Sequence, residues 1–236
     1  MQLPPKTDTL LLSTAYLPPV EYVAWVVQAR QAYIEQYDSY CKQTYRNRCL
    51  IATANGSQAL TIPVEKPAGD TALMRDIRIS DHGNWRHLHW NALVSAYRSS
   101  PFFDYYADDF APFYEKKYPF LLDFNEELLH LILRCMNLEA RIHRTETFRP
   151  LSTKASSKHP FIPSPLPSGA AETPVPYDLR EAIRPKHSQP TGFQARPYYQ
   201  VFAQKQGFLP NLSSIDLLFH TGPESVFTLR DSILLP

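Results

Sequence analysis

Glycine is scarce in this chain, since only 7 of the 236 residues are glycine. No two of them stand in a Gly-x-Gly pattern. The dinucleotide-binding fingerprint and the P-loop both need clustered glycines, because backbone N–H groups must close on phosphate oxygens. The sequence therefore excludes both motifs, and we expect any bound phosphate to be held by arginine and lysine side chains.

Cysteine is also scarce, with three residues, Cys41, Cys49 and Cys135, and no Cys-x-x-Cys spacing. An odd number without that spacing argues against a disulfide framework and against a cysteine-only zinc site. Free thiols suit a reducing compartment, so we expect a cytoplasmic protein.

Neither sign of charge dominates, because 24 Lys and Arg stand against 23 Asp and Glu. The net charge of +1 gives no bulk field that would attract nucleic acid, so no nucleic-acid partner is predicted. The Leu10-Leu11-Leu12 run is too short for a signal peptide, and no stretch approaches the length of a membrane span. We therefore expect no insertion into a membrane.

Proline is abundant instead: 22 residues, nine of them within residues 150–190. That interval also carries Ser-Lys runs and few bulky apolar residues, which is typical of extended chain. We expect a partly mobile insertion at 150–190 within a single domain spanning 1–236. The 44% of hydrophobic residues can fill one sizeable core.

The first part of the chain has the pattern of an α/β protein. Residues 9–17 predict a strand that ends at Pro18 and Pro19, and proline suits the first turn of a helix. Apolar residues at helical spacing then predict a helix over 20–30, and residues 31–37 predict a second strand. This order predicts a βαβ unit.

A hairpin is predicted over residues 49–64, where two β-prone runs flank Asn55-Gly56. Asn-Gly is the strongest short hairpin signal, because a type I′ turn needs a positive φ at both central residues. The second half reads as helical, with Asn84 as an N-cap, short helices over 101–119 and a helix beginning at Asn125. The predicted class is α/β: a mixed sheet from the βαβ unit plus the hairpin, with a helical second half.

The densest polar cluster, residues 35–48, lies where the second strand would end. Ligands collect at the carboxyl ends of strands in open α/β sheets. Lys42, Arg46 and Arg48 suit a phosphate or carboxylate, since the arginine fork binds two oxygens at once. A solvated loop with surface ion pairs is the alternative, and a nucleophilic pair of Cys41 with a histidine is a minor one.

A second cluster reads SDHGNWRHLHW. His87 and His89 are two residues apart and point in opposing directions on a helix, so no metal site is predicted. His82 beside Asp81 suits a general base oriented by a carboxylate, although a capping turn with polar histidines is the favoured interpretation.

Five blocks of this sequence resemble the WbqC-like family, in the family's order. They are STAYLPPVEY, EQYDSYCKQTYRNRCLIATANGSQALTIPV, ISDHGNWRHLHWNALVSAY, PFFDYYADDFAPFYEKKY and YYQVFAQKQGFLPNLSSIDLLFHTGP. The resemblance covers almost the whole chain and is weakest over 151–185. Within the family, the sequence is similar to the branch found in Bacteroidetes.

The resemblance implies a role beside surface-polysaccharide (O-antigen) biosynthesis, for which a glycine transferase activity has been proposed in the family. Three segments of the family are kept in this sequence. Its Lys and Arg-Asn-Arg segment is kept as Lys42 with Arg46-Asn47-Arg48, and its Leu-Thr-x-Pro strand as Leu60-Thr61-Ile62-Pro63. Its late Ser-x-x-Asp segment is kept as Ser213-Ser214-Ile215-Asp216. Other members begin with a His-Gln-Pro-type segment where this chain has residues 13–19, so one candidate catalytic histidine is absent here.

Together these observations predict a transferase that modifies an activated sugar or another carrier-bound precursor, including glycine or aminoacyl transfer. The predicted partner is an anionic, sugar-linked small molecule, and no cofactor is predicted. The candidate catalytic residues are Glu35 or Asp38 as the general base and Lys42 beside the anionic group. The candidate substrate-binding residues are Tyr16, Tyr22, Arg46, Asn47, Arg48, Thr61 and Asp216.

Two other functions remain open. Nucleotidyl transfer is disfavoured, because those enzymes use paired early histidines and the first histidine here is His82. A non-catalytic module that binds a carbohydrate or an envelope-assembly protein is the alternative, motivated by the aromatic stretch 101–119. Burial of Tyr105, Tyr106 and Tyr114 would weaken that alternative.

Overall fold

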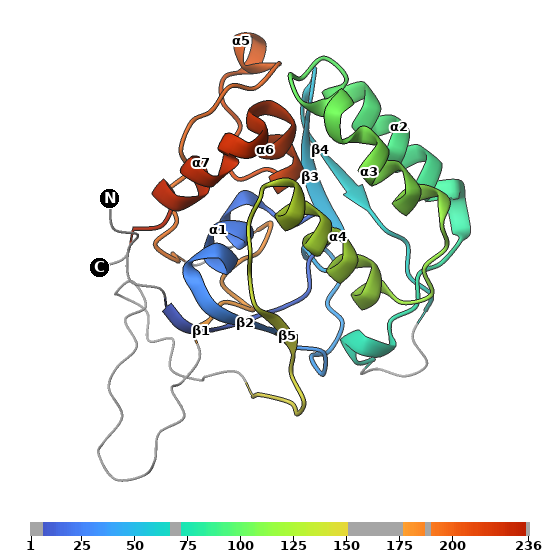
Figure 1. The fold of residues 1–236 in the computed structure, drawn as a ribbon. Helices are drawn as coiled ribbons and strands as arrows, with labels where there is room; N and C mark the ends of the chain where they lie inside the picture. Colours follow the sequence, from blue (N-terminus) through green and yellow to red (C-terminus); the bar gives the residue numbers. More distant parts are fainter. Residues whose placement is uncertain (1–6, 67–71, 151–176, 187–189, 235–236) are drawn as a thin grey trace.

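The computed structural model describes residues 7–66, 72–150, 177–186 and 190–234 (Figure 1). Within them, four parallel strands form one sheet in the order β5-β2-β1-β6. The strands are β1 (Thr7–Leu12), β2 (Ala29–Ile34), β5 (Ile142–Arg144) and β6 (Tyr177–Asp178). An antiparallel hairpin forms a second, separate sheet. The predicted α/β class is confirmed.

The βαβ unit consists of β1, α1 (Val20–Gln28) and β2, and its two strands pair in parallel. Strand β1 ends at Leu12, earlier than predicted, because the following residues bond elsewhere: the Tyr16 N–H donates to the Tyr45 carbonyl oxygen at 2.8 Å. Pro19 is extended and directly precedes α1. Helix α1 lies between the sheet and the C-terminal helices (Figure 1), which explains why it is buried on nearly every side.

The hairpin of β3 (Arg48–Thr53) and β4 (Gly56–Thr61) is confirmed, but its turn differs from the prediction. Thr53 pairs with Gly56, so the two loop residues are Ala54 and Asn55, and only Gly56 has a positive φ, 108°. The Thr53 hydroxyl donates to the Gly56 carbonyl oxygen at 2.8 Å and accepts from the Asn55 N–H. This side chain closes the turn, and Asn55 does not adopt the positive φ that a type I′ turn would need.

The second half of the described chain is mostly helical, as predicted. The helices are α2 (Trp85–Tyr97), α3 (Phe103–Glu115), α4 (Leu121–Cys135), α5 (Ala203–Gln206), α6 (Ser214–Thr221) and α7 (Ser225–Asp231). Three short 3₁₀ turns are Met74–Asp76, His82–Asn84 and Gly222–Glu224.

Three helix predictions need correction. The stretch 101–119 forms one helix of 13 residues, and α4 begins at Leu121, before Asn125. Asn84 precedes α2 but makes no side-chain cap, since its φ is 47° and the capping geometry needs extended backbone.

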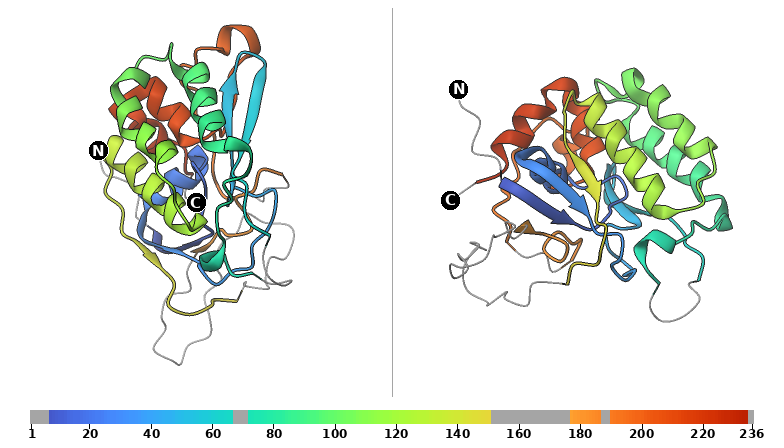
Figure 2. Two further views of the ribbon diagram at one scale, coloured as in Figure 1. Left: turned by 90° about the vertical axis from the view of Figure 1, so that its right-hand side faces the viewer. Right: turned by 60° about the horizontal axis from the view of Figure 1, so that its bottom comes forward.

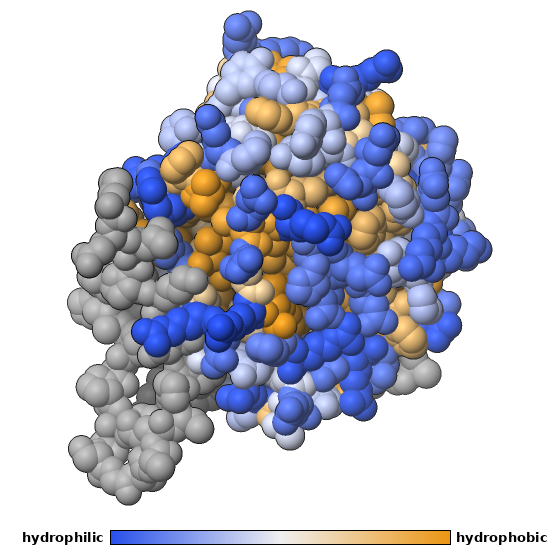
Figure 3. All heavy atoms as spheres, viewed as in Figure 1, coloured by the Kyte–Doolittle hydropathy of each residue, from blue (hydrophilic) through white to orange (hydrophobic). Residues whose placement is uncertain are grey.

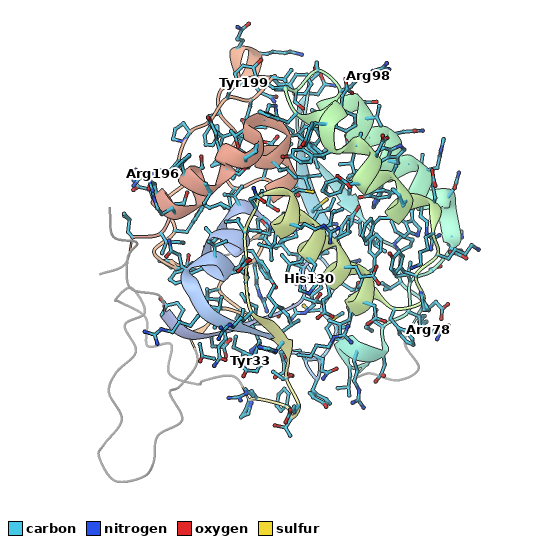
Figure 4. All side chains as sticks on the ribbon, viewed as in Figure 1. Tyr33, Arg78, Arg98, His130, Arg196 and Tyr199 are labelled. Carbon is cyan, nitrogen blue, oxygen red and sulfur yellow. The ribbon has the colours of Figure 1, made fainter. Side chains whose placement is uncertain are left out.

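Helices α2, α3 and α4 lie together on one side of the molecule in two further views (Figure 2). Phe219 of α6 is at the centre of their packing, because its ring meets those of Tyr97, Phe103 and Phe110 at centroid distances of 5.3 to 5.4 Å. Side chains fill the space between sheet and helices (Figure 4). None of the helices within the described ranges is long and apolar enough to cross a membrane.

Most of the proline-rich interval 150–190 lies outside the described residues, which resume at 177–186 and again at 190. Residues 177–186 form β6 and a turn in which Leu179 and Arg180 are buried. This part of the interval therefore belongs to the sheet and its core.

A glycine exchange tests how tightly α6 is packed. At Gly222, which has a φ of 55°, a Cβ atom would lie 2.7 Å from ring carbons of Phe102. Gly83 also has a positive φ, 77°, but nothing lies within 4 Å of its Cβ position. We expect Gly83→Ala to cost about 1–2 kcal/mol through the backbone alone. Gly222→Ala should cost a further ~1–3 kcal/mol through overpacking. Urea unfolding measures both, and equal losses would contradict the predicted clash.

Candidate functional site

The loops that follow the parallel strands meet at one edge of the sheet. Because all four strands run in the same direction, their carboxyl ends share that edge, where ligands bind in open α/β sheets. Ser13 follows β1, Glu35 follows β2, Thr145 follows β5 and Leu179 follows β6. Residues from distant parts of the sequence are thereby brought together.

Arg180 is the centre of this edge, and its side chain is 0% exposed. Its guanidinium donates to Asp178 Oδ2 at 2.7 Å and to Asp38 Oδ1 at 3.1 Å, and lies 3.7 Å from Glu35 Oε2. Burial alone would lower the pKa of Arg180, but its bonds to Asp178 and the nearby carboxylate charges outweigh it and raise that pKa. Arg180 is therefore a permanent buried cation.

Asp38 bridges two arginines. Its Oδ1 accepts from Arg180, and its Oδ2 accepts from Arg46 Nη2 at 3.4 Å. Burial raises the pKa of Asp38, opposed by the charges of Arg180 and Arg46 and reinforced by those of Glu35 and Asp178. A carboxylate with a raised pKa beside a pocket is suited to general-base chemistry.

A narrow pocket opens beside these groups. It is lined by Leu12, Ser13, Thr14, Ala15, Tyr22, Thr44, Tyr45, Arg46, Leu179, Arg180 and Ile183. Two buried polar atoms of the lining, Ser13 Oγ and Arg46 Nε, have no hydrogen-bond partner among the described residues. The pocket admits about one water molecule, so a substrate group enters only as side chains of the lining move.

Glu35 lies just behind the pocket and is 0% exposed. One carboxylate oxygen accepts from the Tyr37 N–H and the Thr145 hydroxyl, and the other accepts from the Arg149 N–H at 2.9 Å. These bonds fix the chain after β2 to the chain after β5. Glu35 therefore positions the loops around Asp38.

The other predicted residues of this region are less central. Lys42 is exposed on the loop before Thr44, and Asn47 is buried with its amide donating to the Ile62 carbonyl oxygen. Arg48 pairs with Thr61 at the base of the hairpin, where its Nε donates to the threonine hydroxyl at 3.1 Å. None of these four residues lines the pocket.

The two predicted tyrosines occupy different places. The Tyr22 ring lines the pocket, and its hydroxyl donates to the Ser13 carbonyl oxygen at 3.0 Å. Tyr16 is fully buried, and its hydroxyl lies 3.0 Å from both His89 Nδ1 and the Tyr114 hydroxyl. Burial lowers the pKa of His89 to about 4, so this histidine is neutral at pH 7 and is part of the core.

Asp216 belongs to a separate buried cluster on α6. Its Oδ2 accepts from the Tyr198 hydroxyl at 2.7 Å and from Gln200 Nε2 at 2.9 Å, and burial raises the pKa of this carboxyl. The hydroxyl of Ser213 donates to the Leu17 carbonyl oxygen and does not cap the helix. Asp216 thus fastens the segment before α6 to that helix.

The histidine-rich cluster around Asp81 shows no catalytic pair. Asp81 accepts from Arg86 and from Lys117, both at 2.7 Å, and its carboxylate makes no hydrogen bond or ion pair with the His82 ring. Within the described ranges, no group of three or more His, Cys, Asp or Glu side chains is arranged to hold a metal ion.

Sequence reasoning missed Arg180, Asp178, Thr145 and Asn125. The Asn125 amide donates to Thr14 Oγ1 at 3.2 Å and to the Arg46 carbonyl oxygen at 2.8 Å, and so ties α4 to both loops of the pocket. The run Asp178-Leu179-Arg180, two opposite charges around one apolar residue, was a usable signal that the surrounding prolines obscured.

Fold and site together define an α/β protein with a charged pocket at the carboxyl edge of a parallel sheet. The chain matches the WbqC-like protein family over residues 14–228, and it belongs to that family. It is also similar to the uncharacterized protein Rv1507c of Mycobacterium tuberculosis, at 27% identity over 231 residues, which cover 93% of this chain and 96% of the relative. No solved structure matches this chain.

The raised pKa of Asp216 has a consequence for stability. The folded protein keeps this carboxyl protonated to a higher pH than the unfolded chain does, so its contribution to stability falls as pH rises from its ordinary pKa to its raised one. In Asp216→Asn this loss is absent. We therefore expect the variant to gain stability relative to wild type over the pH range that begins at the ordinary pKa of aspartate, about 4, and extends upward to the raised pKa of Asp216.

Urea unfolding across that range measures the difference. Asp104→Asn, on the exposed surface of α3, is the control for removal of a charge. A difference between Asp216→Asn and wild type that does not change with pH would contradict the prediction.

Proposed function

We propose that this protein is a transferase that binds the anionic group of an activated sugar or another carrier-bound precursor in the pocket at the sheet edge. The observation that supports this most is the Asp38 carboxylate, held between Arg46 and Arg180 beside that pocket. Glycine or aminoacyl transfer in surface polysaccharide biosynthesis is the finer reaction that we propose.

Arg46 is the residue that we assign to the substrate anion. Three carboxylates already surround Arg180, whereas Asp38 at 3.4 Å is the one carboxylate that Arg46 meets among the described residues. Arg46 also donates to the Thr44 hydroxyl at 3.5 Å, and its Nε is unpartnered. A guanidinium with free donors suits phosphate or carboxylate oxygens. This assignment agrees with the scarcity of glycine, which leaves side chains to hold the anion.

Asp38 is the general base of the proposed reaction. It takes the proton of the attacking amine or hydroxyl while the new bond forms at the transferred carbon and the bond to the carrier breaks. The departing group leaves with its anionic charge on Arg46. The ring of Tyr22 forms a wall of the pocket, and Glu35 holds the loops in place.

The aromatic stretch 101–119 gives little support to a non-catalytic module. Tyr106 and Tyr114 are buried, at 4% and 6% exposure, and only Tyr105 is open to solvent. The two buried rings belong to the core, so neither of them is an exposed stacking platform of the kind that this alternative needs.

A thermal-shift screen of nucleotide sugars, aminoacyl donors and acyl-CoA donors tests the assignment of Arg46. A ligand at about 100 times its Kd stabilises the folded state by about 2.7 kcal/mol, which raises Tm by about 5–10 °C for a chain of this size. We expect Arg46→Ala to abolish that shift and Arg48→Ala, on the hairpin outside the pocket, to keep it. A flat screen, or equal effects of both variants, would refute the assignment.

A second test addresses Asp38. In Asp38→Asn the residue keeps its size and an oxygen for one arginine, but it can no longer accept a proton. We expect this variant to bind the ligand found in the screen and to lose at least ~100-fold in the rate of transfer, the lower range for general-base catalysis. Single-turnover transfer, followed by mass spectrometry, measures it. Undiminished transfer would show that Asp38 is not the base.

A further inference from the structure

A hollow lies between α2 and α3, away from the sheet edge. It has a volume of about 350 Å³, within the range of roughly 300–1,000 Å³ that is typical of ligand pockets. Its lining residues are Asn84, Arg86, His87, Trp90, Ala111, Tyr114, Glu115 and Lys117. None of them lines the pocket at the sheet edge, so this groove is a separate site.

One aromatic ring dominates the groove. Trp90 is half-buried and stacks on Tyr114 at a centroid distance of 5.6 Å, with Phe103 at 6.2 Å. These contacts fix the indole in place, so little side-chain entropy is lost when a ligand packs against it. The indole N–H donates no hydrogen bond to another described residue, so it is available as a donor.

The remaining lining is polar, and its positive charges are largely compensated. Arg86 and Lys117 both donate to Asp81 at 2.7 Å, and Arg86 also stacks on Trp85 at 4.8 Å. Glu115 adds a negative charge, and neither it nor the Asn84 amide bonds another described side chain. The nearby carboxylates therefore disfavour a phosphate group here.

We propose that the groove between α2 and α3 binds a saccharide. The C–H groups on one face of a sugar ring carry partial positive charge and pack against the electron-rich face of an indole. The Asn84 amide, the Glu115 carboxylate and the Trp90 N–H suit the paired donors and acceptors of sugar hydroxyls. An apolar ligand would find Trp90, Ala111 and the largely buried ring of Tyr114, on a surface that is mostly hydrophilic around α2 and α3 (Figure 3).

The inference goes beyond the proposed transferase and does not depend on it. One buried residue nevertheless joins the two sites: the Tyr16 hydroxyl meets that of Tyr114 in the groove, and its neighbour Ala15 lines the sheet-edge pocket.

The test uses the full chain and a panel of methyl glycosides of glucose, galactose, mannose, N-acetylglucosamine and glucuronic acid. Saturation-transfer NMR detects binding, and titration gives Kd. We expect at least one glycoside to bind, with Trp90→Ala weakening it about tenfold or more. Glu115→Gln, an exposed change that leaves the core intact, should weaken it several-fold. Leu88→Ala, on the same helix and outside the lining, is the matched control and should bind as wild type does.

Thermal melts confirm that Trp90→Ala is folded, and Glu115→Gln carries the test alone if it is not. The inference is overturned if no glycoside binds, or if both groove variants bind as tightly as wild type. It is also overturned if Arg46→Ala removes binding and the groove variants do not, which would place the sugar at the sheet edge and leave the proposed transferase standing. If a glycoside binds in the groove but no donor shifts the melting temperature in the thermal-shift screen, only the proposed transferase is refuted.

Discussion

The buried guanidinium of Arg180 is the interaction on which the sheet edge depends. It reaches Asp178 of β6, Asp38 after β2 and the Arg149 carbonyl oxygen after β5, so one side chain holds three segments together. Removing one partner of a buried ion pair leaves an uncompensated charge, which typically costs about 3–5 kcal/mol. The same cluster underlies the proposed chemistry, because burial raises the pKa of Asp38 against the opposing charges of Arg180 and Arg46. Stability and the proposed reactivity therefore depend on the same cluster.

The walls of the pocket are also held by several buried hydrogen bonds. Asn125 bonds both Thr14 and the Arg46 carbonyl oxygen, while Tyr16 is anchored to His89 and Tyr114. Each bond joins a loop to a helix or to a distant loop, and each lies in a buried environment where an unmade hydrogen bond is costly. These bonds hold the loops in place, which suits the proposed reaction, in which two reacting groups must be oriented.

The sequence predicts this fold where its signals are local. Pro18-Pro19 and the apolar spacing of α1 are local, as is Asn55-Gly56, and the βαβ unit and the hairpin follow from them. Strands β5 and β6 have three and two residues, too few to show a period, and they pair with strands far away in sequence. The site divides in the same way. Asp38 and Arg46 could be predicted because they are charged residues that follow a predicted strand. Arg180 could not, because it reaches the site only through the pairing of β6 with β1. Tyr16 and Asp216 have suitable side chains for binding, but only the tertiary structure shows that they are buried.

The scarcity of glycine has a consequence for how the proposed reaction would begin. A backbone cradle binds phosphate without any counter-charge, but a buried arginine needs carboxylates to stabilise it before the substrate arrives. Asp38 is the carboxylate that stabilises Arg46 in this way. When a substrate anion takes its place on Arg46, Asp38 loses one of the two cations that hold its pKa down and gains a further negative charge nearby. In the proposed reaction, substrate binding would therefore raise the pKa of Asp38 and make its carboxylate a stronger base when the proton is removed. Substrate binding and activation of the base are, on this argument, one event.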